Sequence, residues 1–287
     1  FFVFPFVCAI LISFITLSCE SSVQSNNSDS YNKVYKVVDS IRLALQIKLG
    51  KPVPSLNVQI KTPSEDIFVS SFSNQTSAVT KDTYFRFASN TKNFTSASVL
   101  NMQEDGWLNI ESKIVDLIPG SNIPYVPDTP EWNIPYKNQI TIKNLLQHSA
   151  GVYDVSNDTV PGYNYGYVLG VLSVDPEHQF SASELVGVIS NFNLSYFAPG
   201  TNHHYSNTGY SILTEIISRV YTFRSGINKR YSDYLYDFIV GGSSPVPLNI
   251  KFPYLAGDKQ MPTPNIPSLI YEQNGLTTNT SEHNMSA

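Results

Sequence analysis

The chain has 287 residues, which suits one large domain or two interleaved ones. Its net charge is −5 and it contains no long basic run, so we expect no nucleic-acid partner. The two cysteines, Cys8 and Cys19, both lie near the N-terminus, which excludes a disulfide framework and a cysteine metal site in the rest of the chain.

The N-terminal segment is apolar and uncharged up to Leu17 and is followed by a Ser- and Asn-rich tract. This order predicts an export signal over residues 1–19 and a polar linker over residues 20–30. Cys19 is placed as in a bacterial lipoprotein cleavage site, although Thr16 stands where that pattern prefers leucine. Lipid attachment through Cys19, plain signal cleavage and a single membrane anchor stay open. We expect an exported protein, either a periplasmic or cell-envelope lipoprotein or a secreted one, whose natural start lies upstream of Phe1.

The apolar periodicity predicts secondary structure along the rest of the chain. Strands are expected at 56–61 and 66–72, joined as a hairpin, with a strand-like stretch at 84–88. Helices are expected at 31–49, 91–105, 110–117, 141–147, 181–191, 211–220 and 231–239. Ser181 is the expected N-cap of its helix, with Glu184 closing a capping box. The segments 122–138 and 151–179 are expected to be irregular, as is the chain from Gly241 onward, without a further strong strand.

The stretch Ser89-Asn90-Thr91-Lys92 stands where the strand-like segment gives way to a helix. A serine at a helix start lies among free N–H groups at the positive end of the helix dipole. A lysine three residues later lies on the same face, where its amine can take or hold the serine's proton. The Ser-x-x-Lys spacing therefore predicts a nucleophile. By itself the motif favours an N-cap serine followed by an exposed lysine on an amphipathic helix.

Further motifs follow in a fixed order: Gly106-Trp-Leu-Asn-Ile, Ile140-Thr-Ile-Lys-Asn-Leu-Leu-Gln-His-Ser-Ala-Gly, Phe197-Ala-Pro-Gly-Thr and Tyr205-Ser-Asn-Thr-Gly-Tyr. Together with the Ser89 motif, this order resembles the serine beta-lactamase and DD-peptidase superfamily, in its class C beta-lactamase and D-alanyl-D-alanine carboxypeptidase branch. The resemblance covers about residues 31–287. The stretch from Gly151 to Asp158 is more similar to the carboxypeptidases.

The resemblance implies an α/β (α+β) fold over residues 31–287, with an antiparallel sheet flanked by helices and a helical subdomain. It implies that Ser89 is the acylated nucleophile and that Lys92 assists removal of its proton. Tyr205 corresponds to the base or proton shuttle, and Asn207 to the residue that binds the substrate amide. The Ser89 N–H corresponds to half of an oxyanion hole. No cofactor is implied.

One family motif, His/Lys-Thr/Ser-Gly, does not occur after Tyr205. We therefore expect a C-terminally truncated catalytic domain with an incomplete sheet and an unpaired edge. His148 matches a family position that is usually structural. The pair His203-His204 lacks acidic or histidine partners at ligand spacing, so we expect no metal site there.

The sequence leaves three functional hypotheses. The first is an exported serine hydrolase that forms an acyl-enzyme on Ser89 and acts on D-Ala-D-Ala peptides, beta-lactams, or related amides and esters. The second is a non-catalytic cell-envelope binding protein that keeps the beta-lactamase fold and binds sugars or peptides through exposed aromatics at 163–167. The third is an unrelated α/β protein in which Ser89 and Tyr205 lie far apart. The oligomeric state stays open.

Overall fold

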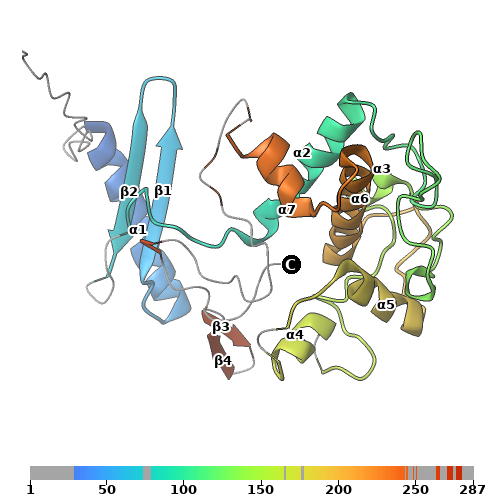
Figure 1. Ribbon diagram of the computed structural model, residues 1–287. Coiled ribbons are helices and arrows are strands. Elements are labelled where there is room, and N and C mark those ends of the chain that lie inside the picture. Colours follow the sequence, from blue (N-terminus) through green and yellow to red (C-terminus); the bar gives the residue numbers. More distant parts are fainter. Residues whose placement is uncertain are drawn as a thin grey trace, which may run out of the picture. The chain divides into compact units, whose positions relative to one another are not determined.

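The computed structural model describes residues 29–73, 79–164, 166–175, 178–242, 244, 248, 250, 263–265, 270–273 and 276–279. The chain divides into two compact units, residues 1–83 and 84–287, which are described separately here (Figure 1). The predicted export signal, most of the predicted linker and Cys19 lie outside the described residues. The domain limits expected from the sequence stay a prediction. Within the described segments, every helix is too short or too polar to cross a bilayer.

The first unit is one helix beside a two-stranded hairpin. Helix α1 (Asp29–Leu49) begins two residues earlier than predicted, inside the expected linker. Strands β1 (Ser55–Lys61) and β2 (Asp66–Phe72) pair antiparallel, with Ser55 opposite Phe72 and Lys61 opposite Asp66. The predicted helix and hairpin are confirmed. The buried apolar residues of this unit form a small cluster: Val38, Ile67 and Val69.

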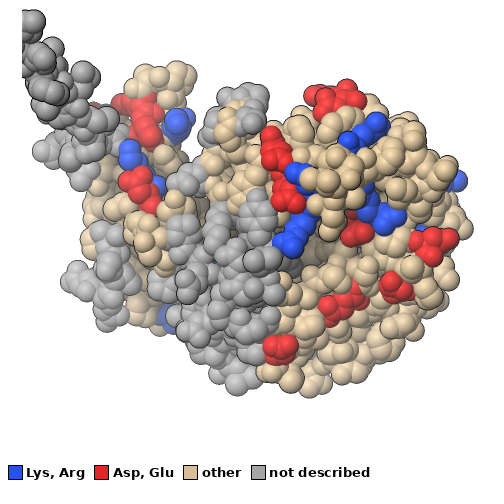
Figure 2. All heavy atoms as spheres, in the orientation of Figure 1, with Lys and Arg blue, Asp and Glu red and all other residues tan. Residues whose placement is uncertain are grey.

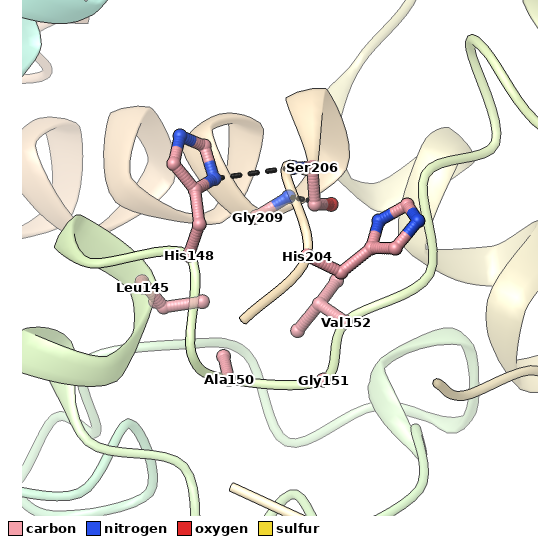
Figure 3. Close-up of a pocket in the computed structure, with 8 residues that line it drawn as sticks. All are labelled: Leu145, His148, Ala150, Gly151, Val152, His204, Ser206 and Gly209. Carbon is pink, nitrogen blue, oxygen red and sulfur yellow. Dashed lines mark hydrogen bonds between the residues drawn. The ribbon is translucent and has the colours of Figure 1, made fainter. Parts of the chain in front are cut away.

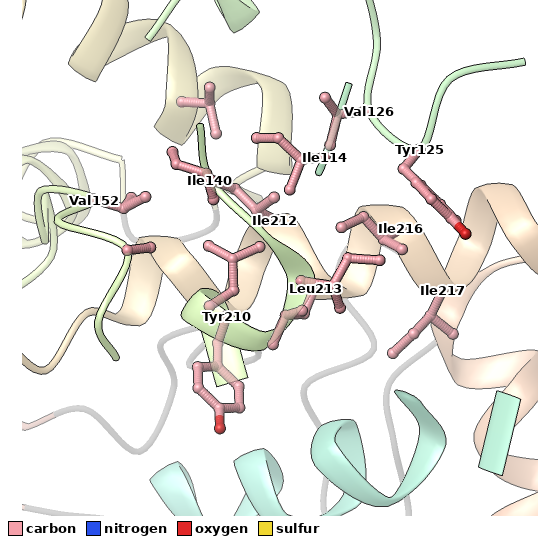
Figure 4. Close-up of a cluster of buried hydrophobic side chains, with 14 of the residues drawn as sticks. Ile114, Tyr125, Val126, Ile140, Val152, Tyr210, Ile212, Leu213, Ile216 and Ile217 are labelled. Atoms are coloured by element: carbon pink, nitrogen blue, oxygen red, sulfur yellow. The ribbon is translucent and has the colours of Figure 1, made fainter. Parts of the chain in front are cut away.

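The second unit is built around helix α6 (Asn207–Ser225). This helix contacts α2 (Thr91–Glu104), α3 (Ile142–Leu146), α5 (Ala182–Phe192) and α7 (Tyr231–Tyr234). Its buried apolar face follows the spacing of a helix, and five of its side chains are completely buried: Ile212, Leu213, Ile216, Ile217 and Val220. Several of them meet Ile114, Tyr125 and Ile140 in the core (Figure 4).

The predicted helix starts and ends are largely confirmed by their caps. Helix α2 ends one residue before the predicted Asp105, and Gly106 follows with a positive φ of 68°. Thr141 caps α3 by accepting the Asn144 N–H through its side chain. Ser181 caps α5 by accepting the N–H of Glu184. The Glu184 carboxylate, predicted to close the box, instead bonds the Tyr167 hydroxyl and the His178 ring.

Two predicted elements are wrong because long-range backbone bonds replace local ones. Residues 84–88 form no strand: Tyr84 makes a single bridge to Asn265, and a 3-10 turn, η1 (Ala88–Asn90), follows. Residues 110–117 form no helix. There, the Ile114 N–H donates to the Ile140 carbonyl, and the Ile110 carbonyl accepts from Lys143. The chain thus pairs with a distant segment where its spacing predicts a helix.

Other segments hold more structure than predicted. Helix α4 (Tyr167–Leu172) lies in the segment expected to be irregular. A short antiparallel hairpin, β3 (Ile270–Gln273) and β4 (Leu276–Asn279), lies where no strand was expected. A 3-10 turn, η2 (Pro130–Trp132), lies in the first predicted loop, and a π-helical turn, η3 (Leu235–Ile239), completes the predicted last helix.

Two of the three tyrosines in the segment 163–167 do not have the exposure that the binding hypothesis assumed, and Tyr165 lies outside the described residues. Tyr163 and Tyr167 are half-buried and pack against the core of the second unit. The Tyr167 hydroxyl donates to the Glu184 carboxylate at 2.7 Å, which ties α4 to α5. These two rings therefore stabilise the fold rather than present a free aromatic surface.

The fold class expected from the sequence agrees with this architecture. The described part of the chain combines helices with two small antiparallel sheets, β1–β2 and β3–β4, and neither sheet closes into a barrel.

On the face of the molecule shown in Figure 2, the described Lys and Arg side chains are scattered among acidic ones.

Candidate active site

Ser89 lies in the turn η1, directly before helix α2. Ala88 adopts a left-handed conformation with φ of 45°, which costs free energy for a residue with a Cβ. The Thr91 hydroxyl donates to the Ala88 carbonyl at 2.7 Å and holds the turn. As a result, the Ser89 side chain is exposed at the start of the helix.

Lys92 follows one helical turn later, and its half-buried side chain returns toward Ser89. Its Nζ donates to the Ser89 Oγ at 3.4 Å and to the Asn207 Oδ1 at 2.7 Å. The same Nζ lies 4.8 Å from the centre of the Tyr205 ring. One ammonium group therefore contacts the three other residues that the sequence singled out.

Tyr205 completes the cluster from the opposite side. Its Oη lies 2.7 Å from the Ser89 Oγ, although the two residues are 116 positions apart in the chain. The ring is 38% exposed, so the serine and the phenol both face a surface that a substrate can approach. The third hypothesis, which places Ser89 and Tyr205 far apart, is wrong.

Packing between α2 and α6 brings these two chain segments together. The Ser96 hydroxyl on α2 bonds the Tyr210 hydroxyl on α6 at 3.0 Å, and the Tyr210 hydroxyl also donates to the Leu146 carbonyl. Tyr210 thus joins α2, α3 and α6 at one buried point. The Ser89 turn and the start of α6 are adjacent because their helices share this contact.

A second set of bonds positions the segment before Tyr205. Residues 148–151 run beside residues 196–204: the Tyr196 N–H donates to the Gly151 carbonyl, and the His204 N–H donates to the His148 carbonyl. Gly151 has φ of 69°, and a Cβ there would lie 1.9 Å from the Phe197 carbonyl oxygen. Only glycine fits at this close approach. The approach fixes the position of residues 196–204, and so of Tyr205, which follows them.

His148, assigned a structural role from the sequence, lies against the phenol of the cluster. Its ring centre is 4.6 Å from that of Tyr205, and its Nδ1 accepts the Ser206 N–H at 3.1 Å. Burial, together with the charge of Lys92, lowers the pKa of His148 from 6.5 to about 4. The ring is therefore neutral at pH 7 and covers one face of Tyr205.

Asp154 is the site residue that the sequence did not single out. Its side chain is 1% exposed, and its Oδ2 accepts both the backbone N–H and the side-chain Nδ2 of Asn207 at 3.2 Å. The residue stands in the motif that pointed to the carboxypeptidases, but in a segment predicted to be irregular. Hydrophobic periodicity does not reveal a single buried carboxylate in an irregular segment.

A shallow hollow lies behind the cluster rather than over Ser89. Figure 3 shows it between the end of α3 and the start of α6, and it has an empty volume of about 170 Å³ that opens to solvent. Its lining combines His148, His204 and Ser206 with small and apolar residues. These residues contact or flank Tyr205, so the hollow is part of the packing around Tyr205 and not a separate site.

The adjacent histidines are held by aromatic contacts. The His204 ring stacks on Tyr196 at 3.8 Å between ring centres, and His203 lies edge-on to His148 at 6.0 Å. Within the part of the chain that the structure describes, no group of three or more His, Cys, Asp or Glu side chains is arranged to hold a metal ion.

All four residues predicted from the sequence thus meet in one cluster. Ser89, Lys92, Tyr205 and Asn207 are linked by three hydrogen bonds. A serine hydroxyl that contacts a phenol oxygen and an ammonium can transfer its proton to the deprotonated phenol oxygen and attack a carbonyl carbon. The arrangement can therefore perform acyl transfer through a serine.

Comparison with known proteins gives a family model and several similar proteins. The family model described as Beta-lactamase matches residues 68–240. The chain is 30% identical over 172 residues to a protein of Dichelobacter nodosus named "Putative fimbrial assembly protein FimD, serogroup D", covering 59% of this chain and 38% of that one. It is 29% identical over 153 residues to penicillin-binding protein 4* of Bacillus subtilis (strain 168), covering 53% of this chain and 27% of that one. The chain therefore matches less than half the length of these curated relatives.

A solved structure gives the same fold. The D-stereospecific amidohydrolase from a Streptomyces species matches with a TM-score of 0.62 and 21% identity, over 86% of this chain and 65% of the other. At that identity the likeness establishes the fold, which confirms the fold class expected from the sequence.

Proposed function

Because the chain belongs to the Beta-lactamase family, we propose that it is a serine hydrolase that forms an acyl-enzyme on Ser89. One observation carries the proposal: the Ser89 Oγ lies 2.7 Å from the Tyr205 Oη and 3.4 Å from the Lys92 Nζ. These are hydrogen-bonding distances between a nucleophile, a proton acceptor and a cation.

In the proposed first step, the deprotonated Tyr205 oxygen takes the Ser89 proton while the Ser89 Oγ bonds to the carbonyl carbon of the substrate. Collapse of the tetrahedral intermediate breaks the bond to the leaving group, which receives the proton from Tyr205. Water then repeats the sequence, with Tyr205 as its base, and releases the acid. Proton transfer of this kind contributes about 10²- to 10⁴-fold to rate.

The ammonium of Lys92 stabilises negative charge on the Tyr205 oxygen and on the serine oxygen during transfer. Its bond to Asn207 Oδ1 fixes its position. Asn207 in turn carries a side-chain amide at the edge of the cluster, where we propose that it binds the substrate amide. The Ser89 N–H as an oxyanion donor stays part of the proposal.

We propose D-Ala-D-Ala peptides, beta-lactams, or related amides and esters as substrates. Two names among the similar proteins support this class: a penicillin-binding protein and a D-stereospecific amidohydrolase. Export, with lipid attachment through Cys19 or plain signal cleavage, is also proposed, and it rests on the sequence of residues 1–19 alone.

The test is covalent labelling of the purified chain by a fluorescent penicillin, read by denaturing gel and by mass spectrometry. We expect one label, on the peptide that contains Ser89, and none on the Ser89→Ala variant. Tyr205→Phe keeps the ring and removes the hydroxyl, so we expect labelling to slow by about 10²-fold or more. Ser190→Ala, on α5 away from the cluster, is the matched serine control and keeps the label.

If a label appears on Ser89→Ala, the serine is not the nucleophile. If the unaltered chain acquires no label and hydrolyses neither D-Ala-D-Ala peptides nor small esters, the hydrolase proposal fails. Binding of peptidoglycan without acylation would then favour the non-catalytic cell-envelope protein.

A further inference from the structure

Asp154 carries a buried carboxylate that the proposed reaction does not use. It lies in the loop between α3 and α4, and four donors converge on its two oxygens. The Ser156 N–H donates to Oδ1 at 3.0 Å, and the Asn157 Nδ2 donates to Oδ2 at 2.8 Å. The backbone N–H and the side-chain Nδ2 of Asn207 complete the set. Every one of these contacts comes from a donor, which is the pattern of an ionised carboxylate.

The two ends of the Asn207 amide meet opposite chemistries. Its Nδ2 faces the carboxylate of Asp154, and its Oδ1 faces the ammonium of Lys92. Turning the amide over would set its N–H groups against the ammonium and its oxygen against the carboxylate. Both contacts would then be repulsive, so the orientation of the amide is determined from both sides.

We propose that Asp154 is a positioning residue that acts through Asn207: it holds the Asn207 oxygen on Lys92, and so holds the Lys92 ammonium beside Ser89 and Tyr205. This inference rests on the proposed function and deepens it. The carboxylate also accepts the first N–H of α6, where the positive end of a 19-residue helix favours negative charge. Asp154 thereby fixes the start of α6 and the Asn207 amide with the same oxygen.

The position requires an acceptor without a donor. An asparagine at 154 keeps the shape but offers one oxygen instead of two and carries no charge, so an N–H₂ group must meet one of the four donors. Its bonds to Asn207 are also weaker than those of a carboxylate. The Asn207 amide, and through it the Lys92 ammonium, is then held less firmly.

The first test compares Asp154→Asn with the unaltered chain in the rate of fluorescent-penicillin labelling. We expect the labelling rate to fall on the order of 10²-fold. Asp128→Asn is the control, because the Asp128 carboxylate is exposed and pairs with Lys137. We expect that variant to keep the labelling rate. Equal labelling rates for Asp154→Asn and the unaltered chain would overturn the proposal.

A cycle of variants separates positioning from general support of the fold. If Asp154 acts through Asn207, then Asp154→Asn slows labelling no further in a chain that already carries Asn207→Ala. Independent losses that multiply in the double variant would contradict the proposal.

A third measurement is made on the unaltered chain and requires neither enzymatic activity nor a folded Asp154 variant. In the unaltered chain labelled with ¹⁵N-asparagine, the Asn207 side-chain resonance is assigned by its loss in Asn207→Ala. We expect its two amide protons to be widely separated in shift and slow to exchange. Shifts and exchange like those of an exposed asparagine would overturn the Asp154 proposal. Absence of both penicillin labelling and hydrolysis of D-Ala-D-Ala peptides and small esters, together with a held amide, would overturn the hydrolase proposal alone.

Discussion

Helix α1 of the first unit leaves Val37, Ile41 and Ile47 exposed at 57%, 48% and 82%, whereas α6 of the second unit buries Ile212 and Ile216 completely. Both helices were predicted from apolar spacing, and both form. They differ in what packs against them, because among the described residues the first unit buries three apolar side chains in its main cluster and the second buries 28 in its own.

The difference shows that the spacing of apolar residues specifies where a helix forms, while packing against neighbouring elements fixes the position of that helix. A helix held by a few contacts can shift without large loss of buried area. The four residues of the candidate site all belong to the second unit, where several helices meet on α6. A distance of 2.7 Å between hydroxyls on separate segments requires that kind of support.

The largest expected effect is in the core of the second unit. Trp132 is completely buried, and its Nε1 donates to the Ser183 Oγ on α5 at 2.9 Å. We expect Trp132→Ala to lower the free energy of unfolding by about 3–5 kcal/mol, measured by urea denaturation, and to abolish labelling at Ser89. Trp132→Phe keeps most of the ring volume and should lose less. Retained labelling in a destabilised Trp132→Ala chain would mean that the site does not depend on this core.

A smaller and more local effect is expected in the first unit. Arg42 is 8% exposed, and its Nε donates to the Ser71 Oγ at 2.6 Å. That hydroxyl and Arg42 both bond Asp39, which lowers the pKa of the Asp39 carboxyl. Arg42→Ala removes the guanidinium bonds to Ser71 and Asp39 and leaves that hydroxyl and that carboxylate to bond each other alone. We therefore expect a loss of about 1–3 kcal/mol in the protection of β1 and β2 amides from hydrogen exchange.

Lys48→Ala, at an exposed position of the same helix, is the control and should change protection by less than about 0.5 kcal/mol. Labelling at Ser89 should stay at the level of the unaltered chain in both variants. If Arg42→Ala also abolishes labelling, the contrast between the two units does not hold.

The smallest expected effect is a pH dependence that belongs to the second unit. The pKa of His148 is about 4 in the folded chain and about 6.5 when free. Between these values the unfolded chain binds more protons, so folding stability falls as the pH is lowered from 6.5 toward 4. We expect the melting temperature to fall by a few degrees over this range.

His148→Asn is the matched variant for this effect. Asparagine tolerates the left-handed conformation at this position, where φ is 54°, and its side-chain oxygen can accept the Ser206 N–H. It does not titrate, so the melting temperature should depend less on pH in the variant. An unchanged dependence would show that another group is responsible.

Local rules accounted for most elements of the fold. The caps at Thr141 and Ser181, the glycine after α2 and the alternation in β1 and β2 are decided by residues within one or two turns of each other. The wrong predictions, at 84–88 and 110–117, fall where backbone groups bond distant partners. The helix α4 and the hairpin β3–β4 were missed because their segments are short and lack a sustained period.

For the candidate site, too, some features follow from local sequence and others from tertiary structure. The sequence by itself singled out the four residues to which we assign the chemistry, because Ser89-x-x-Lys92 and Tyr205-x-Asn207 are short motifs whose order along the chain resembles a known family. Tertiary structure alone decided that the two pairs meet, that His148 covers Tyr205 and that Asp154 holds Asn207. The reason is physical: these contacts join segments up to 116 positions apart, and their geometry comes from a core that no local pattern encodes.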